Sequence, residues 1–352
     1  MLGIIMAGGK GTRLMPLTLH RPKPLVEVLG RPVIDYVKEA MLDAGITDVV
    51  VTTGYRGEQL EQHVASWMNG MTNIRARVNQ ESSPMGTAGS VGLLRNEIAQ
   101  TCVVGSGDAV ASFDIGALLA AHRKNKAKVT MALWQVEDPS EFGIVGLSAT
   151  SDGPVDGDLR EGFIRRFLEK PKPEEAFSNV INAGLYILEP EVFEHVPLGE
   201  KFDFSKQLFP RLLELGWPMY AQAIDGVWFD VGHPFELLNA QSTLIERYDE
   251  LPFTYPNNFV EFNGVLTASS SSMNGTAADA VIGSSCVVGH ESKLERALLM
   301  DGCQIGAGSQ IIESVLGRNV QVGDGCRVHR CIVGDGTVLE PNGHYVDQRI
   351  PN

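Results

Sequence analysis

The amino-acid sequence predicts an α/β fold with a Rossmann-like, mostly parallel sheet, followed by a short parallel β-helix. Up to about residue 250, short apolar runs alternate with segments whose apolar residues recur at helical spacing. This alternation is typical of a parallel sheet covered by helices on both faces. From residue 281 onward, apolar and small residues recur in steps of six, six and five, a period of about 17 residues. That period indicates a β-helix of the hexapeptide kind, with three short strands in each coil.

Each expected element follows from its own apolar pattern. Short apolar runs bounded by glycine or polar residues predict strands at 2–6, 49–53, 74–79, 101–108, 128–136 and 227–232. Helical spacing predicts helices at 32–44, 58–68, 114–125, 203–216 and 235–250. We therefore assign an α/β domain to residues 1–250, a linker of low complexity to 251–280, and the β-helix to 281–345.

The bulk properties exclude several classes of partner. The 352 residues are long enough for two domains, and their formal net charge is -14. An acidic chain argues against binding nucleic acid or an anionic membrane, since both require a basic face. No apolar run has the length of a membrane span, and no leader peptide is evident. The five cysteines are odd in number and not spaced as metal-binding pairs, so we expect a cytoplasmic protein.

A glycine-rich loop follows the first expected strand. Residues 2–25 read LGIIMAGGKGTRLMPLTLHRPKPL. Glycines let the backbone approach a ligand and present its N–H groups to phosphate oxygens. Arg13 and Lys23 add two cations, and the stretch offers no nucleophile. The spacing fits neither the P-loop nor the dinucleotide-binding GxGxxG pattern. Positive charge with bare backbone is what phosphoryl or nucleotidyl transfer requires.

The whole stretch closely resembles GGxGTRLxPLTxxxPKPL, the signature of the sugar-phosphate nucleotidyltransferases. Further strings resemble elements of that family in the same order: GTAG at 86–89, GD at 107–108, EKP at 169–171, NAGLY at 182–186 and WFDVG at 228–232. One departure is Ser106, where the family usually has asparagine. The resemblance implies a catalytic domain that joins a nucleoside triphosphate to a sugar 1-phosphate and releases pyrophosphate.

The resemblance also implies the residues of the site. Arg13, Lys23, Asp108 and Asp230 would be catalytic, and the two aspartates would hold a Mg²⁺ ion. The expected nucleotide-binding residues are Ala7, Gly8, Gly9, Gly11, Thr12, Arg13, Glu81, Gly86, Thr87 and Gly107. The expected sugar-phosphate-binding residues are Lys23, Gly143, Glu169, Lys170, Asn182 and Gly184.

The nucleobase preference depends on one position. Relatives that take uridine or thymidine triphosphates carry a glutamine five positions before the loop glycine, and here Glu81 stands five before Gly86. An ionised carboxylate only accepts hydrogen bonds, and guanine presents two adjacent donors. We therefore favour GTP with mannose 1-phosphate or a related sugar or cyclitol phosphate. If Gln80 faces the base instead, the alternative is a glucose-1-phosphate uridylyl- or thymidylyltransferase. A glucose-1-phosphate adenylyltransferase is a further alternative.

The C-terminal repeat resembles the left-handed β-helix attached to many sugar nucleotidyltransferases. Bifunctional relatives use it for acetyl transfer, but no looped insertion carries a catalytic histidine here, so we favour a structural role. Covering its exposed edge predicts a homo-oligomer through this domain. Four cysteines fall on its small-residue register and Cys102 lies in an apolar strand, so we expect all five to be packed inside. A non-catalytic regulator that binds a nucleotide sugar is the alternative from another class, although such a protein is expected to lose the cations or carboxylates.

Overall fold

The computed structural model describes residues 1–54, 57–69, 73–157 and 159–351. The chain divides into two compact units. The first unit holds residues 1–9 and 36–228, and the second holds residues 10–35 and 229–352. The glycine-rich stretch is therefore shared: Gly8 and Gly9 belong to the first unit, and the segment from Lys10 onward belongs to the second.

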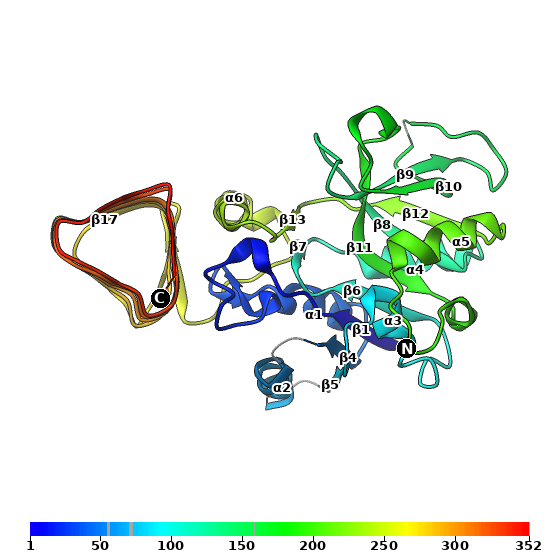
Figure 1. Ribbon diagram of the computed structural model, residues 1–352, viewed down its shortest axis with the longest axis horizontal. Helices are drawn as coiled ribbons and strands as arrows, with labels where there is room; N and C mark the ends of the chain where they lie inside the picture. The colour runs from blue at the N-terminus through cyan, green and yellow to red at the C-terminus, as the bar shows by residue number, and fades with distance from the viewer. Residues whose placement is uncertain (55–56, 70–72, 158, 352) are drawn as a thin grey trace. The chain divides into compact units, whose positions relative to one another are not determined.

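The first unit is built on a nine-stranded sheet of order β5-β4-β1-β6-β11-β8-β12-β10-β9 (Figure 1). The strands are β1 Leu2–Met6, β4 Asp48–Thr53, β5 Arg75–Gln80, β6 Cys102–Ser106, β8 Val129–Gln135, β9 Gly143–Ser148, β10 Glu161–Glu169, β11 Val180–Leu188 and β12 Met219–Ala223. Strands β5, β4, β1 and β6 pair in parallel, as the alternating pattern predicted. Strand β11 then pairs antiparallel with both β6 and β8, so the other half of the sheet is mixed. The predicted α/β fold class is confirmed.

Helices cover this sheet because their apolar faces must be buried. They are α1 Ile34–Asp43, α2 Gly57–Ser66, α3 Gly86–Gly92, α4 Ile115–Lys124 and α5 Phe209–Glu214. Apolar residues of α3 and α5 join strand residues such as Ile4, Val104 and Met131, which are 0% exposed, in one continuous core. Such burial contributes roughly 1.5–3 kcal/mol for each large apolar side chain.

The helix expected over 203–216 is present, but its first turn is π-helical. The structure forms a π-helical turn at Phe204–Leu208 and then α5. The Leu208 N–H donates to the Asp203 carbonyl, five residues back. Pro210 lies in the first turn of α5, where its missing N–H leaves no hydrogen bond unmade.

The second unit is dominated by a β-helix whose coils superpose as a triangle in Figure 1. Its parallel strands include β17 Thr276–Ile282, β18 Val287–Val288, β19 Lys293–Leu299, β20 Gln304–Ile305, β21 Gln310–Leu316, β22 Gln321–Val322, β23 Arg327–His329, β24 Ile332–Val333, β25 Val338–Leu339, β26 His344–Val346 and β27 Arg349–Ile350. Ile282, Leu299 and Leu316 stack at 17-residue intervals, as the period predicted. All five cysteines are buried, which confirms their expected packing.

The expected linker at 251–280 contains strands from residue 259 onward, which the apolar pattern did not predict. Strands β14 Phe259–Phe262, β15 Val265–Ala268 and β16 Ser272–Met273 precede β17. Strand β15 pairs in parallel with β17, with Val265 opposite Ala280. This coil has a step of 15 residues and is made largely of alanine, serine and threonine. The shorter step and small residues hid it from the apolar periodicity.

Segment 10–35 and helix α6, Pro234–Glu246, pack on the β-helix within the second unit. Gln241 on α6 donates to the Ala297 carbonyl at 3.1 Å. Arg21 donates to both carboxylate oxygens of Asp335 at 2.6 Å. Arg318 pairs with Glu27, which belongs to the short hairpin of β2 Glu27–Val28 and β3 Arg31–Pro32. Among the described residues, no helix is both long and apolar enough to cross a membrane.

The stacked core of the β-helix predicts the effect of truncating one of its side chains. Leu299→Ala should lower the free energy of unfolding by about 2–5 kcal/mol, because it removes a fully buried side chain from between two coils. Urea unfolding followed by circular dichroism measures this change. Val287→Ala is the matched control, since Val287 is 40% exposed and should cost roughly 0.5 kcal/mol. Equal effects of the two variants would contradict the proposed core.

Candidate functional site

The carboxyl ends of four parallel strands meet in the first unit. The Ala7 N–H donates to the Thr52 carbonyl at 2.8 Å, and the Gly107 N–H donates to the Met6 carbonyl at 2.9 Å. The Glu81 N–H donates to the Thr53 carbonyl at 2.8 Å. These bonds bring together the ends of β1, β4, β5 and β6. Ligands of open α/β sheets bind at this edge, where the expected nucleotide-binding residues of this unit begin.

Glu81 faces the glycine loop, whereas Gln80 faces helix α2. A side chain at Gly8 would bring its Cβ within 3.1 Å of Glu81 Oε1. A Cβ at Gly57, the first residue of α2, would lie 2.9 Å from Gln80 Cδ. The other Glu81 oxygen accepts a hydrogen bond from the Met85 N–H at 2.8 Å. Burial raises the pKa of Glu81, opposed by the hydrogen bond from the Met85 N–H.

The loop that begins α3 is held by residues far along the chain. Gly86 has a φ of +72°, and a Cβ there would lie 2.7 Å from the Phe202 carbonyl oxygen, so glycine is required. The Thr87 hydroxyl and N–H both contact Asp203 Oδ1 at 3.3 Å. The expected nucleotide loop is therefore supported by segment 202–204.

Asp108 follows β6 on a short polar turn. The Ser106 hydroxyl donates to Asp108 Oδ1 at 2.5 Å. Ser106 also lies against Gly184, where a Cβ would be 3.2 Å from Ser106 Cβ. Because Gly184 has a φ of +82°, it takes a conformation that favours glycine. Ser106, which departs from the family pattern, thus connects the expected carboxylate to the expected sugar site.

Among the expected sugar-binding residues of the first unit, Asn182 lies beside Gly184, and Gly143 lies beside Glu169. The Asn182 amide donates to the Tyr186 hydroxyl at 2.8 Å and to Ser205 at 3.3 Å, and its oxygen accepts from the Gly184 N–H at 2.9 Å. A Cβ at Gly143 would lie 2.8 Å from Glu169 Oε2, so only glycine leaves that carboxylate room.

Electrostatics also link these residues. Burial raises the pKa of Glu169, which the nearby Lys170 and Lys206 oppose. The Lys170 ammonium pairs with Glu141 at 3.0 Å on the surface. Burial raises the pKa of Tyr186 too, and both Glu169 and Asp108 act in the same direction. The expected sugar site and Asp108 therefore influence a common tyrosine.

Segment 203–206 is the part of this site that the sequence did not reveal. Asp203 accepts a hydrogen bond from the Thr87 hydroxyl, and Ser205 accepts one from the Asn182 amide. The charge of Lys206 opposes the rise in the pKa of Glu169. In the sequence these residues are simply the polar start of an expected helix. Their role comes from tertiary contacts across more than 20 positions, for which no local signal exists.

The second unit contains the expected catalytic cations. Thr12, Arg13 and Leu14 form a 3₁₀ turn that begins after Gly11, whose φ is +63°. A Cβ at Gly11 would lie 2.9 Å from Lys23 Cβ, so glycine lets the two segments approach. Lys23 is buried at 7% exposure.

Asp230 joins the two cations. It ends strand β13, Trp228–Asp230, as expected from the sequence. Its Oδ1 lies 3.1 Å from the Lys23 ammonium, and its Oδ2 lies 3.6 Å from the Arg13 guanidinium. A Cβ at Gly232 would lie 2.9 Å from both Arg13 and Asp230. Three of the four predicted catalytic residues therefore form one charged cluster, while Asp108 belongs to the first unit.

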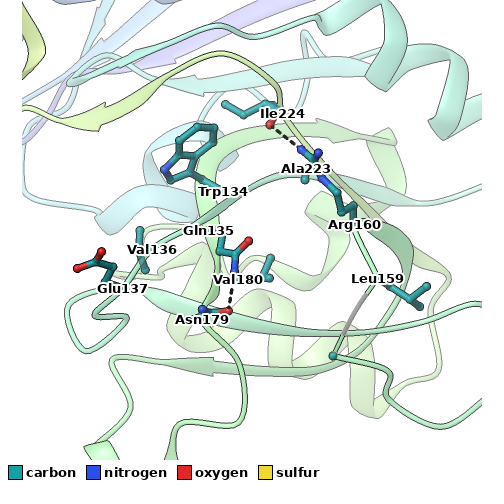
Figure 2. Close-up of a pocket in the computed structure, with 11 residues that line it drawn as sticks. Trp134, Gln135, Val136, Glu137, Leu159, Arg160, Asn179, Val180, Ala223 and Ile224 are labelled. Atoms are coloured by element: carbon teal, nitrogen blue, oxygen red, sulfur yellow. Dashed lines mark hydrogen bonds between the residues drawn. The ribbon is translucent and has the colours of Figure 1, made fainter. Parts of the chain in front are cut away.

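A separate cavity of about 720 Å³ opens in the first unit (Figure 2). Trp134, Gln135, Arg160 and Asn179 are among its lining residues, and Arg160 points toward the Ile224 carbonyl. Of the described residues that line it, none is a predicted site residue. The cavity therefore does not define the expected nucleotide or sugar site.

The fold and these clusters define a nucleotide-handling α/β protein that carries a hexapeptide β-helix. Two family models match the chain: "Nucleotidyl transferase" over residues 2–247, and "GlmU-like, C-terminal hexapeptide" over residues 265–346. The chain belongs to the nucleotidyl transferase family. The second match begins at β15 and so includes the coil that the sequence pattern missed.

Curated relatives agree with this assignment. The chain is 32% identical to the mannose-1-phosphate guanylyltransferase catalytic subunit beta of Drosophila pseudoobscura pseudoobscura, over 72% of this chain and 66% of the relative. It is 32% identical to mannose-1-phosphate guanyltransferase beta-A of Xenopus laevis, over 70% and 65%. It is 28% identical to "Probable mannose-1-phosphate guanylyltransferase 3" of Oryza sativa subsp. japonica, over 86% and 82%. The matched part thus spans just under two thirds of the first two relatives.

The burial of the Lys23 ammonium beside Asp230 lets us predict how an Asp230 variant changes stability. Asp230→Asn should lower the free energy of unfolding by about 1–3 kcal/mol, because it removes the charge that compensates buried Lys23. Chemical denaturation measures the change. Asp225→Asn is the matched control, since its Arg160 pair is exposed and should contribute roughly 0–1 kcal/mol. A smaller loss for Asp230→Asn than for the control would refute the compensation.

Proposed function

We propose that this protein is a sugar-1-phosphate nucleotidyltransferase that converts GTP and mannose 1-phosphate into a nucleotide sugar and pyrophosphate. The membership of the family supports the reaction class. The observation that carries the choice of GTP is the position of Glu81 beside Gly8 at the strand ends, with Gln80 turned to α2. A related sugar or cyclitol phosphate would use the same residues.

The proposed reaction is an in-line displacement. A phosphate oxygen of the sugar phosphate attacks the α-phosphorus of the nucleotide, and the bond to the leaving pyrophosphate breaks. Arg13 would neutralise charge on the triphosphate and on the leaving pyrophosphate. Lys23 would stabilise the charge that develops at the α-phosphorus, and Lys170 would leave Glu141 to hold the sugar phosphate. No general base is required, since the attacking phosphate is already ionised.

The donor set fits a hard divalent cation. Mg²⁺ is bound through one or two carboxylates together with substrate phosphates. Asp108 and Asp230 supply two such carboxylates, and the Ser106 hydroxyl orients the first. We propose that these residues hold the ion, which would supply positive charge to the phosphates of the nucleotide.

The proposed base recognition uses both oxygens of Glu81. The N1–H and 2-amino groups of guanine are adjacent donors that match a carboxylate. A uracil or thymine needs a donor as well as an acceptor, which an ionised Glu81 does not offer.

A non-catalytic nucleotide-sugar regulator is the alternative from another class. The cluster of Arg13, Lys23 and Asp230 argues for the enzyme, because a regulator has no need to keep a buried lysine aimed at a carboxylate. We further propose that the protein is cytoplasmic and that it forms a homo-oligomer. Light scattering of the purified protein tests the oligomeric state.

The reaction is tested by pyrophosphate release with Mg²⁺. GTP, UTP, dTTP, ATP and CTP are each combined with mannose, glucose and N-acetylglucosamine 1-phosphates, and we expect turnover with GTP and mannose 1-phosphate. Asp108→Asn should lower turnover at least about 100-fold, because it removes a proposed metal carboxylate. Asp114→Asn, which only caps α4, is the control. Full activity of Asp108→Asn would remove Asp108 from the metal site.

Base selection predicts a change of nucleotide. Glu81→Gln should weaken GTP binding about 10- to 100-fold, through loss of charged hydrogen bonds, and improve UTP or dTTP binding. Isothermal titration with each nucleotide measures this. Gln80→Glu is the control, and a switch of preference in that variant alone would show that Gln80 reads the base.

The pH dependence follows from the raised pKa of Glu81. Only the carboxylate accepts both guanine donors, so a proton competes with GTP. The pKa of Glu81 lies above the ordinary 4.5. The affinity of the wild type for GTP should therefore fall as the pH decreases toward this raised pKa. The fall should begin at a higher pH than it would for an exposed glutamate. The Glu81→Gln variant should lack this dependence.

A further inference from the structure

Arg349 on the last strand of the β-helix contacts the turn that carries Arg13. We propose that Arg349 is a positioning residue for the catalytic cations, so that the β-helix takes part in the reaction without touching substrate. The expected effect on turnover rests on the proposed function, and the expected effect on the Arg13 turn does not.

The contacts of Arg349 converge on two functional loops. One guanidinium nitrogen donates to the Arg13 carbonyl at 2.7 Å and to the Met15 carbonyl at 2.9 Å. Another lies 3.3 Å from His233 Nε2. His233 caps α6 directly after the loop that carries Asp230 and Gly232. A single side chain thus connects the Arg13 turn with the Asp230 loop, all within the second unit.

The Arg13 turn needs support from outside because it is short. It is a single 3₁₀ turn of three residues, in which the Leu14 N–H donates to the Gly11 carbonyl at 3.0 Å. The Arg13 side chain is 58% exposed and 3.6 Å from Asp230. Such a loose ion pair orients a flexible side chain weakly. Fixing the Arg13 backbone therefore determines where its guanidinium can reach.

The chemistry of the contact requires an arginine. A planar guanidinium donates in several fixed directions, so one of its nitrogens can hold two carbonyls while another lies beside the His233 ring, whereas an ammonium acts as a point charge. Burial and the charge of Arg349 lower the pKa of His233, which favours the neutral imidazole.

Other contacts hold segment 10–35 on the β-helix. Arg21 pairs with Asp335 and Arg318 pairs with Glu27, so segment 10–35 is already docked on the two preceding coils. Strand β27 pairs with β24, with Ile332 opposite Arg349. Arg349 adds the contact that reaches the catalytic turn itself.

The test compares Arg349→Ala, Arg349→Lys and the control Arg327→Ala, an exposed arginine on β23. Hydrogen exchange is measured without substrate. We expect at least about threefold faster exchange of the Leu14 and Leu17 amides in Arg349→Ala, at an unchanged melting temperature. In turnover we expect a 10- to 100-fold lower kcat with KM for both substrates within about twofold, since the loss concerns orientation. Arg349→Lys should fall between, and millimolar guanidinium should restore part of the Arg349→Ala rate.

Each outcome decides the inference. Unchanged exchange and kcat in Arg349→Ala would overturn it, as would an equal loss in Arg327→Ala or a rise in KM alone. If the wild type shows no turnover, the proposed function fails, and the exchange experiment still decides the positioning. If Arg349→Ala does not fold, the exchange and kcat of Arg349→Lys decide in the same way.

Discussion

The ion pair between Lys23 and Asp230 is the constraint on which the signature segment depends. The lysine is buried, so its charge needs a carboxylate close by, and Asp230 supplies it at 3.1 Å. The chain is acidic overall, and Arg13 and Lys23 bring two positive charges together at Asp230. Gly11 and Gly232 are required because side chains at either position would collide with this cluster. The glycine signature is thus explained by packing around charges as well as by access for phosphates.

The segment that carries these cations cannot hold its own shape. Residues 10–35 form two 3₁₀ turns and a hairpin of two-residue strands, which bury little surface among themselves. Charged contacts to Asp335 and Arg318 fix it on the β-helix instead. In this reading the repeat domain is the scaffold of the cations, which agrees with the structural role expected from the absence of an acetyl-transfer loop.

The sequence predicted the parts of the structure that have periodic or local signals. Strands β1, β4, β5, β6, β8 and β13 and the coils from Val281 onward followed from apolar spacing, whereas β9, β10, β11 and β12 were not predicted. The first coil escaped because its 15-residue step and small residues break the apolar period. The sequence did not reveal Ser205, Lys206 and Arg349, because their roles depend on contacts with residues distant in the chain. A surface arginine in a repeat has no local signal that distinguishes it from other surface arginines. Tertiary contacts of polar residues therefore set the limit of what could be inferred.

The division of the chain separates two kinds of function. The residues proposed to contact the base and the sugar, Glu81, Asn182 and Glu169, belong to the unit built on the sheet. The cations and Asp230 belong to the unit that contains the β-helix. Apart from Asp108, changes at the proposed site residues of the sheet unit should therefore act on which substrate binds, and changes in the β-helix should act on how well the bound phosphates react. Selection on Arg349 and the coil that carries it would then tune the rate and leave the choice of base and sugar unchanged.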